Sequence, residues 1–582
     1  MKETIVLCRM AVSVLALCAG GLEAQTAPNA SALERTRQHA PAPTSTPITA
    51  ADLRTRLFIF ADDSMEGRFI ATSGNVKGTD YIAREAKRLG LEPAGDAGTY
   101  FQTVPVMTRE LDAAARFAIG GATLEPWKDF VPRDNGPTTR SVSGVPTIYA
   151  GVWGDSTSLI TGDAAAGKVV IVITTATDSG SQFLGLPNRP AVTNYFSRAA
   201  GIMVIGVDRI APQALDGYKQ PAIGQPSSDT PELPAYLYIT ARVARAALGA
   251  EYSEVKPGTV GQPFTGEPRF AESPAKFPAR NVVGILRGSD PVLRNEFIAI
   301  GAHNDHIGVN PGPVAHDSVF LFNRLYREQG AEAPAGALTA QDFAKLNAQL
   351  AEVRRTTGGA SARLDSIANG ADDDGSGSVS VLELAEYFAG QRTRPKRSLL
   401  FVWHVGEEVG LWGSEYFTDH PTVSRDSIVA QLNIDMIGRG GMADVTGATK
   451  AGELIHGGPN YLQVIGSRRL STELGDLVDK VNVEKKHGFA FDYALDADGH
   501  PQNIYCRSDH YSYARYGIPI AFFTTGGHAD YHQVTDEPQY IEYDHMARVV
   551  NLIKDIAVAA GNLDHRIVVD KPKPDPHGAC KQ

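Results

Sequence analysis

Hydrophobic residues between Arg280 and Gly526 occur in short, almost uninterrupted runs that alternate with amphipathic stretches. The runs are NVVGILRG, EFIAIGAH, SLLFVWHV, SIVAQLNIDM and IPIAFFTTG, and helical patterns such as SVSVLELAEYFAG separate several of them. Strands that are apolar on both faces are typical of a parallel sheet with helices on both sides. The pattern therefore predicts an α/β fold with a mainly parallel central sheet sandwiched by helices.

The region before these runs has two different textures. Helical patterns occur in AADLRTRLFIFA and in GTDYIAREAKRLG, whereas residues 142 to 248 consist mostly of short strands and glycine-rich turns such as GKVVIVITT and AAGIMVIGVD. A small β-rich domain inserted at residues 142–260 would explain the change. The main domain would then comprise residues 48–141 and 261–565, followed by a tail, residues 566–582, that we expect to be frayed.

The first 24 residues begin with basic positions, continue through an apolar run and end in small residues, which is typical of a secretory signal peptide. Cys18 raises the alternative of a lipoprotein anchor, although the bulky Leu17 before it disfavours this. Residues 25–47 are rich in Ala, Pro, Ser and Thr and predict a disordered spacer. We expect a secreted or periplasmic protein with no membrane span, because no later apolar run approaches eighteen residues.

Composition narrows the range of partners. The chain has 582 residues, 43% of them hydrophobic, and a formal net charge of -11. An acidic chain without a block of basic residues is a poor candidate for binding nucleic acid, so peptides, proteins or small molecules are better candidates. Two of the four cysteines lie in the leader, which leaves Cys506 and Cys580. Export would permit them to pair, but two cysteines do not define a disulfide framework.

Polar residues that could bind a metal follow the ends of the apolar runs. EFIAIGAH ends in His303, SLLFVWHVGEE ends in Glu407 and Glu408, and SIVAQLNID ends in Asp435. The loop after IPIAFFTTG carries His528, Asp530 and His532. Parallel sheets carry their sites at the carboxyl ends of the strands. These nitrogen and oxygen donors, without cysteine, suit zinc or a similar divalent ion in a hydrolytic site.

The loop NGADDDGSG, residues 369–377, adds three consecutive aspartates just before the helical pattern SVSVLELAEYF. It is similar to a calcium-binding EF-hand loop. If Gly375 is the sixth position of such a loop, however, Gly370 and Val381 occupy the first and twelfth positions, where carboxylates are needed. An EF-hand site is therefore excluded.

Five motifs in one order, GAHNDHIG, NGADDDGSG, HVGEEVGLWGSEYF, NIDMIGR and DYHQVTDEP, resemble those of the two-zinc exopeptidases that include bacterial leucyl aminopeptidase and glutamate carboxypeptidase II. The resemblance covers roughly residues 50 to 560. It also implies that the predicted insert is a protease-associated domain. One departure is the stretch of about 310–365, which is longer than in compact relatives and has helical patterns suited to a lid or an oligomer contact.

The resemblance implies a ligand set and two catalytic residues. Asp373 would bridge two Zn²⁺ ions, or another divalent metal, with its neighbours Asp372 and Asp374 shaping the loop. The remaining implied residues are His303 and Asp435 at one ion, Glu408 and His532 at the other, Glu407 as the general base, and Tyr531, which would stabilise the tetrahedral intermediate. Chemistry supports the division between adjacent glutamates, because one must bind metal while the other moves a proton.

Several other polar residues lie close to the implied ligands in the sequence. Asp305 would either orient the imidazole of His303 or be exposed to solvent. His306, His528 and Asp530 are expected not to bind metal. Asp509 and His510, in the segment RSDHYSYARYGIP, are candidates for lining the pocket.

The function that this implies is a metal-dependent exopeptidase, and an aminopeptidase is the leading hypothesis. A carboxypeptidase or dipeptidase of the glutamate carboxypeptidase type is the alternative, with Arg439 and Arg507 as candidate partners of a substrate carboxylate. A glutaminyl-cyclase-like acyltransferase is disfavoured, because that chemistry uses one zinc. An inactive binding homologue, as in transferrin-receptor-like relatives, would have lost ligands, and none is missing here. Peptides or proteins would be the substrates, and the sequence leaves the oligomeric state open.

Overall fold

The computed structural model describes residues 39–582, except 134–139, 141, 175–185, 211, 227–231, 267–268, 334, 337 and 357–362. The expected signal peptide, residues 1–24, lies outside the described residues, as does most of the spacer. The end of the spacer is ordered, contrary to expectation, because Thr44 Oγ1 donates a hydrogen bond of 2.6 Å to Glu386. No helix in the described part of the chain is both long and apolar enough to cross a bilayer.

The larger sheet runs in the order β1-β14-β18-β15-β19-β24-β22-β23, with β2 also paired to β14. Its four central strands, β18, β15, β19 and β24, are parallel, which confirms the predicted core of the fold. The flanking pairs β14·β18 and β22·β24 are antiparallel, so the complete sheet is mixed. Its strands are β1 (Glu92–Pro93), β2 (Phe101–Val104), β14 (Ala279–Leu286), β15 (Phe297–His303), β18 (Ser398–His404), β19 (Ile428–Ile434), β22 (Tyr461–Ile465), β23 (Ala490–Asp492) and β24 (Ile520–Thr524).

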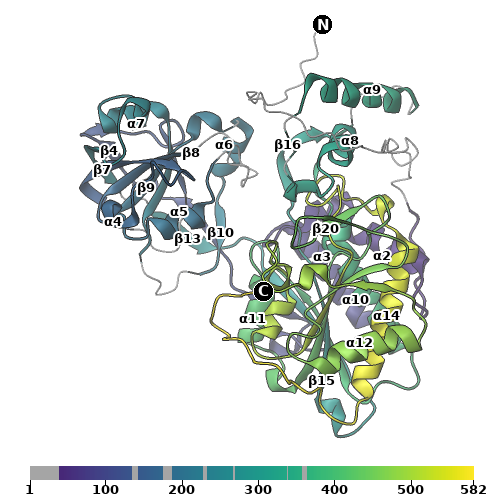
Figure 1. The fold of residues 1–582 in the computed structure, drawn as a ribbon. Helices are drawn as coiled ribbons and strands as arrows, with labels where there is room; N and C mark the ends of the chain where they lie inside the picture. Colours follow the sequence, from purple (N-terminus) through teal and green to yellow (C-terminus); the bar gives the residue numbers. More distant parts are fainter. Residues whose placement is uncertain are drawn as a thin grey trace.

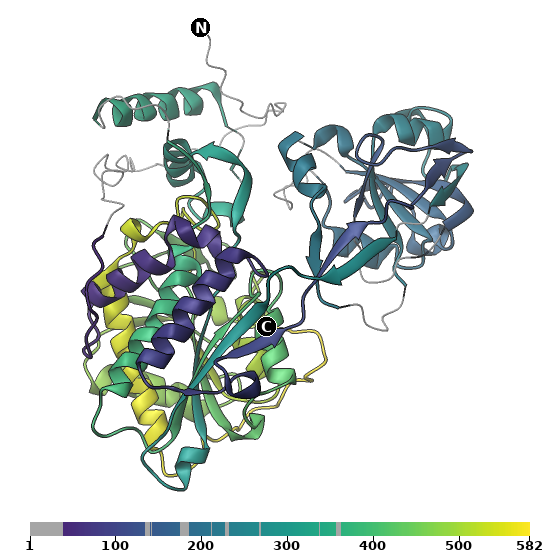
Figure 2. The same ribbon diagram turned by 180° about the vertical axis from the view of Figure 1, so that it is seen from behind.

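Helices cover both faces of this sheet (Figures 1 and 2). In β18, Phe401 and Trp403 pack on one face, while Leu400 and Val402 pack on the other. Every residue of this strand is buried, which explains its continuous apolar run. The first face is covered by α2 (Ala50–Phe60), α3 (Ser73–Arg88), α10 (Gly377–Ala389), α12 (Thr472–Glu484) and α14 (Tyr543–Asn562), and the second by α11 (Trp412–Asp419) and α13 (His510–Ala514).

A second sheet, in the order β5-β4-β12-β7-β8-β9-β11-β6, lies to one side of the first in both views (Figures 1 and 2). Strands β7, β8, β9 and β11 are parallel, and α4 (Gly162–Ala165), α5 (Arg189–Tyr195) and α7 (Ala241–Leu248) lie between or after them. This unit is therefore rich in strands, as expected, with short helices between them. Its strands are β4 (Phe117–Ile119), β5 (Ala122–Thr123), β6 (Phe130–Arg133), β7 (Val142–Trp153), β8 (Val169–Thr174), β9 (Gly201–Ile205), β11 (Ala235–Ile239) and β12 (Val260–Gly266).

The second sheet begins earlier in the chain than the sequence predicted. Strands β4, β5 and β6 belong to it, although we assigned residues up to 141 to the main domain. These strands are two to four residues long, so they carry too little hydrophobic pattern to be assigned from sequence. Whether this unit is a protease-associated domain stays a prediction.

The long stretch between β15 and α10 forms a separate helical layer (Figure 1). It contains α8 (His316–Tyr326) and α9 (Ala340–Thr356), framed by a ribbon of β16 (Val309–Ala315) and β17 (Leu364–Ile367). Leu346, Leu350 and Val353 of α9 pack against Phe320 and Leu321 of α8. The helical insertion predicted at about 310–365 is therefore present, and we call residues 309–367 the helical insertion below.

The tail is attached to the rest of the molecule, contrary to the expectation that it is frayed. Cys580 forms a disulfide with Cys506, across 74 positions of sequence. The open question of whether these cysteines pair is thereby answered within the structure. The tail is the yellow segment that ends at the point marked C in Figures 1 and 2.

Candidate functional site

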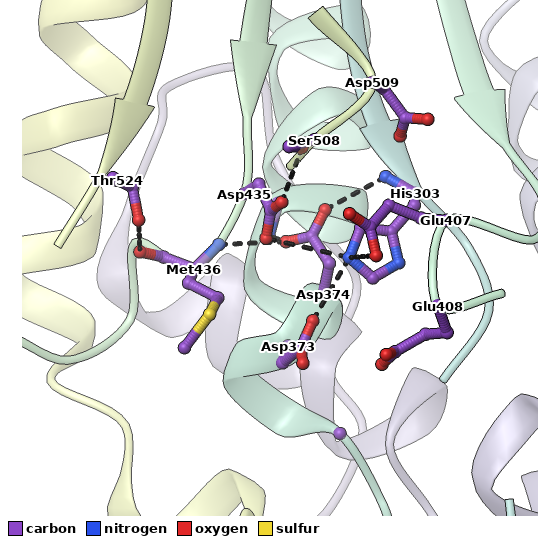
Figure 3. A network of polar contacts seen from close by, with 12 residues as sticks. His303, Asp373, Asp374, Glu407, Glu408, Asp435, Met436, Ser508, Asp509 and Thr524 are labelled. Atoms are coloured by element: carbon purple, nitrogen blue, oxygen red, sulfur yellow. Dashed lines mark hydrogen bonds and ion pairs between the residues drawn. The ribbon is translucent and has the colours of Figure 1, made fainter. Parts of the chain in front are cut away.

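The predicted ligand residues converge at the carboxyl ends of the parallel strands. His303 is the last residue of β15, Asp435 follows β19 directly, and Glu408 lies in the loop after β18. The side chains of His303, Asp373 and Glu407 point toward one another in Figure 3. The segments that carry His303, Glu408 and Asp435 were recognised in the sequence because each follows an apolar run.

The loop before α10 orients its three aspartates differently. The carboxylate of Asp372 accepts a hydrogen bond of 2.6 Å from the backbone N–H of Gly438. The carboxylate of Asp374 accepts backbone hydrogen bonds, including one of 3.0 Å from His303 and one of 2.8 Å from Gly377. Both flanking carboxylates thus hold the backbone in place, while that of Asp373 faces the cluster of histidines and acids.

One group of possible metal ligands consists of His303, Asp373 and Asp435. The Nε2 atom of His303 lies 3.1 Å from Asp373 Oδ1 and 3.6 Å from Asp435 Oδ1. The other oxygen of Asp435 accepts a 2.7 Å hydrogen bond from the hydroxyl of Ser508. On the far side of the His303 ring, Nδ1 lies 3.1 Å from the backbone carbonyl oxygen of Asp305. Such a bond fixes the ring so that Nε2 faces the carboxylates.

A second group consists of His306, Asp373, Glu408 and His532. The Nε2 atom of His532 lies 2.9 Å from Asp373 Oδ2 and 3.0 Å from Glu408 Oε2. The other oxygen of Glu408 lies 2.7 Å from Nδ1 of His306. Asp373 belongs to both groups and directs one oxygen toward each.

These atoms fit divalent cations. Nε2 of His303, Nε2 of His532 and Nδ1 of His306 are buried and have no hydrogen-bond partner among the described residues. Buried ring nitrogens beside carboxylate oxygens are satisfied when a cation accepts both sets of lone pairs. The donor set contains only nitrogen and oxygen, so zinc or a similar divalent ion suits it.

Glu407 lies at the edge of the cluster, with Oε2 4.0 Å from Nε2 of His303. Burial, together with the nearby carboxylates of Asp435 and Glu408, raises the pKa of Glu407 well above its usual value. Its loop is held by Asp305, whose Oδ1 accepts hydrogen bonds of 2.7 Å from Gly406 N and 3.3 Å from Glu407 N. Asp305 therefore orients the loop of Glu407 in addition to lying 3.8 Å from Nδ1 of His303.

Part of the chain is similar to a known peptidase family. Residues 356–557, about a third of the chain, match the family described as Peptidase family M28. The region of residues 356–557 therefore belongs to peptidase family M28. The matched region contains Asp373, Glu407, Glu408, Asp435 and His532, whereas His303 lies before it.

Among curated relatives, leucine aminopeptidase 1 of Coccidioides posadasii (strain C735) is 34% identical over 188 residues, which is 31% of this chain and 43% of that protein. The chain therefore spans less than half the length of that relative. Leucine aminopeptidase 1 of Aspergillus niger (strain CBS 513.88) is 29% identical over 300 residues, 46% of this chain and 70% of that protein. A solved aminopeptidase from Aneurinibacillus sp. strain AM-1 has 15% identity and a TM-score of 0.48, with 90% of this chain and 97% of that chain covered.

Tyr531 lies beside the second ligand group. Its ring stacks on that of His532, with the centroids 3.9 Å apart. Burial, together with the negative charges of Asp373 and Glu408, raises the pKa of Tyr531 well above its usual value. The phenol is therefore protonated at neutral pH and can donate a hydrogen bond.

His306 is the residue that sequence reasoning excluded and the structure brings in. We expected it not to bind metal, yet it is fully buried and belongs to the second ligand group. A Cβ atom on Gly370 would lie 2.5 Å from Cγ of His306, so the glycine leaves room for the ring. The close spacing of His303 and His306 within HNDH was the signal in the sequence.

Four other polar residues singled out in the sequence belong to neither ligand group. His528 and Asp530 are outside both ligand groups, as expected: Nε2 of His528 lies 3.3 Å from Asp372, and Asp530 pairs with arginines. The candidate Asp509 does not line the cavity, and its carboxylate lies 3.4 Å from Nδ1 of His404. His510 points away from the cavity, with Nε2 2.8 Å from the carbonyl oxygen of Tyr505.

A cavity of about 410 Å³ opens beside the ligand groups. Arg507 lines it, but both of its terminal nitrogens are paired with the carboxylate of Glu332. Arg439 is buried between Asp444, at 3.2 Å, and Asp530, at 2.7 Å, and does not line the cavity. Of the two arginines considered as partners of a substrate carboxylate, Arg507 is therefore already paired with Glu332, and Arg439 does not line the cavity.

Proposed function

We propose that this chain is an exported, metal-dependent aminopeptidase that uses two divalent ions, with zinc as the leading candidate. The observation that carries the proposal is the position of Asp373, whose two carboxylate oxygens face two separate histidine and carboxylate groups. The names of the curated relatives support the aminopeptidase assignment. The leader-like N-terminus and the disulfide support export, since disulfides persist in oxidising compartments.

The ligand groups would be His303, Asp373 and Asp435 on one side, and Asp373, Glu408 and His532, with His306 beside them, on the other. Ions held there would polarise the scissile carbonyl group and lower the pKa of the attacking water.

The chain's own residues would handle the proton and the developing charge. Glu407 would take a proton from the attacking water and return it to the leaving amine. The Tyr531 phenol would donate a hydrogen bond to the oxygen on which negative charge develops. Asp305 would keep Glu407 in position through the backbone of its loop.

A substrate panel tests the reaction class. We expect hydrolysis of aminoacyl substrates with a free amino terminus and little hydrolysis when that terminus is acetylated. Preferential cleavage of N-acylated dipeptides would instead support the carboxypeptidase alternative, for which Arg507 is the only candidate that lines the cavity among those considered.

Replacement of the base tests the mechanism. Glu407→Gln keeps the size of the side chain but cannot accept the proton, so we expect kcat to fall by about 10² to 10⁴ while metal content is retained. Turnover close to that of the wild type would remove Glu407 from its proposed role. Loss of the metals in this variant would show that Glu407 acts as a ligand.

A further inference from the structure

The cavity of about 410 Å³ beside the predicted metal ligands has an apolar part in its lining. Met436, Leu495, Ile504 and Phe522 line this part. Leu495 and Phe522 are buried, whereas Met436 and Ile504 are half-buried. Apolar lining with few polar groups is typical of a pocket that selects a side chain by size and shape.

One wall of this cavity is formed by residues 494–507, which contribute Leu495, Gln502, Ile504, Cys506 and Arg507. We call this segment the pocket wall. It contains two short 3₁₀ turns, Ala494–Asp496 and Ile504–Cys506, and otherwise no regular helix or strand. A segment without a hydrogen-bonded ladder depends on its neighbours for a fixed position.

The tail supplies the first set of attachments. Cys580 is disulfide-bonded to Cys506. The side-chain oxygen of Gln582 accepts a 3.0 Å hydrogen bond from Tyr505 N, and its amide nitrogen donates to the carbonyl oxygen of Leu495. Gln582 thus connects the two 3₁₀ turns, and the disulfide fixes the second of them.

The tail also reaches the middle of the pocket wall. The backbone oxygen of Gln582 accepts a 2.8 Å hydrogen bond from Gly499 N, and its side-chain amide lies 3.2 Å from the carbonyl oxygen of Ala497. Lys581, between the two attached residues, is exposed. Attachment is therefore specific to Cys580 and Gln582.

The helical insertion supplies the second set of attachments to the pocket wall. Glu332 pairs with both terminal nitrogens of Arg507, one of them at 3.1 Å. Its own position is fixed next to the site, because Ala331 N donates a 3.1 Å hydrogen bond to Tyr531 O. Gly330 has a φ of +60°, and a Cβ there would lie 2.5 Å from Tyr531 O, so the insertion approaches the loop as closely as a glycine allows.

We propose that the pocket wall determines which terminal side chain the enzyme accepts, and that Gln582, Cys580 and Glu332 are positioning residues for it. This inference rests on the proposed aminopeptidase function. A long apolar side chain would contact Leu495 and Ile504, whereas that of alanine would be too short to reach them. Preorganisation of the wall should therefore affect binding of large terminal residues far more than the chemical step.

Steady-state kinetics of the full chain with leucyl, phenylalanyl and alanyl p-nitroanilides test this proposal. For Gln582→Ala and Cys580→Ser we expect KM to rise about tenfold for the leucyl and phenylalanyl substrates, with kcat within about twofold of the wild type. KM for the alanyl substrate should stay within about twofold. The matched control is Lys581→Ala, which should behave as the wild type with all three substrates.

Glu332→Gln provides a second route, because it leaves the tail intact. It keeps the length of the side chain but weakens the pair with Arg507, so KM for the large substrates should rise in the same direction. Thermal unfolding of each variant separates a displaced wall from a loss of folded protein.

The outcomes distinguish this inference from the proposed function. Equal changes for alanyl and phenylalanyl substrates, or none in any variant, would overturn the role of the wall while wild-type hydrolysis of the same substrates still supported an aminopeptidase. Absence of hydrolysis by the wild type, with its metals bound, would contradict the proposed function itself.

Discussion

Asp372 and Asp373 are adjacent in the chain but bind different partners. Oδ1 of Asp372 accepts a hydrogen bond from Gly438 N, whereas the oxygens of Asp373 lie 3.1 Å from Nε2 of His303 and 2.9 Å from Nε2 of His532. Burial favours protonation of Asp373, but the adjacent rings of His303 and His532 hold its pKa well below its usual value. Asp373 is therefore negatively charged in the position shared by both ligand groups.

This difference predicts opposite results for two isosteric substitutions. Asp373→Asn removes the charge shared by both groups, so we expect loss of bound metal and of activity. Asp372→Asn keeps an oxygen that can accept from Gly438 and should keep the metals, with a lower stability of about 1–3 kcal/mol. Metal analysis by mass spectrometry and denaturant unfolding would measure both effects. Loss of metal from Asp372→Asn alone would reverse the assignment.

His306 provides a second test, directed at the Glu408 side of the site. Its Nδ1 lies 2.7 Å from Glu408 Oε1, so the ring either contacts the ion or holds the carboxylate that does. For His306→Gln we expect metal affinity to fall by about 10–100-fold, measured by competition with a chromogenic chelator. The control is His510→Gln, because His510 is equally buried but bonded to Tyr505 O. An unchanged metal affinity in His306→Gln would exclude both roles.

The sequence predicted the metal-binding segments because each follows an apolar strand or precedes an apolar helix. β15 and β18 are buried on both faces, so their patterns were continuous and their ends were visible. The resemblance to a known family then assigned a role to particular polar residues in each segment.

The contacts that hold the pocket wall join residues far apart in the chain, and no local sequence pattern predicts them. Glu332 and Arg507 are 175 positions apart, and Cys506 and Cys580 are 74 apart. The attachment of Gln582 depends on backbone groups of the pocket wall, which any sequence carries. Hydrophobic periodicity predicts which faces of helices and strands are buried, but not which polar groups pair with one another. The contacts that hold the pocket wall could therefore not be predicted from the sequence.

The close approach of the helical insertion to the site predicts the effect of a single methyl group. Gly330→Ala would place a Cβ 2.5 Å from Tyr531 O in a residue with a φ of +60°. We expect lower kcat/KM, because the loop that carries Tyr531 and His532 must move, and a loss of stability of about 1–3 kcal/mol. Gly336→Ala is the control in the same insertion, since a Cβ there meets nothing within 4 Å. Equal behaviour of the two variants would show that the approach is unimportant.

Glu383 in α10 provides a prediction about pH and stability. It is almost fully buried, and its Oε2 accepts a 3.0 Å hydrogen bond from Nε of Arg56. Burial raises the pKa of Glu383 from 4.5 to about 7, although Arg56 opposes this rise. Because the pKa is higher in the folded state, the contribution of Glu383 to stability is fully present below pH 4.5 and is lost as the pH rises to about 7.

Glu383→Gln removes this titration while keeping an acceptor for Arg56. The free energy of unfolding of the wild type, minus that of the variant, should therefore decrease between about pH 4.5 and pH 7.5, by on the order of 3 kcal/mol. Urea unfolding of both proteins at these two pH values measures the difference, and contributions from all other titrating groups cancel to first order. A difference that stays constant, or that increases with pH, would show that Glu383 is ionised in the folded protein at its ordinary pKa.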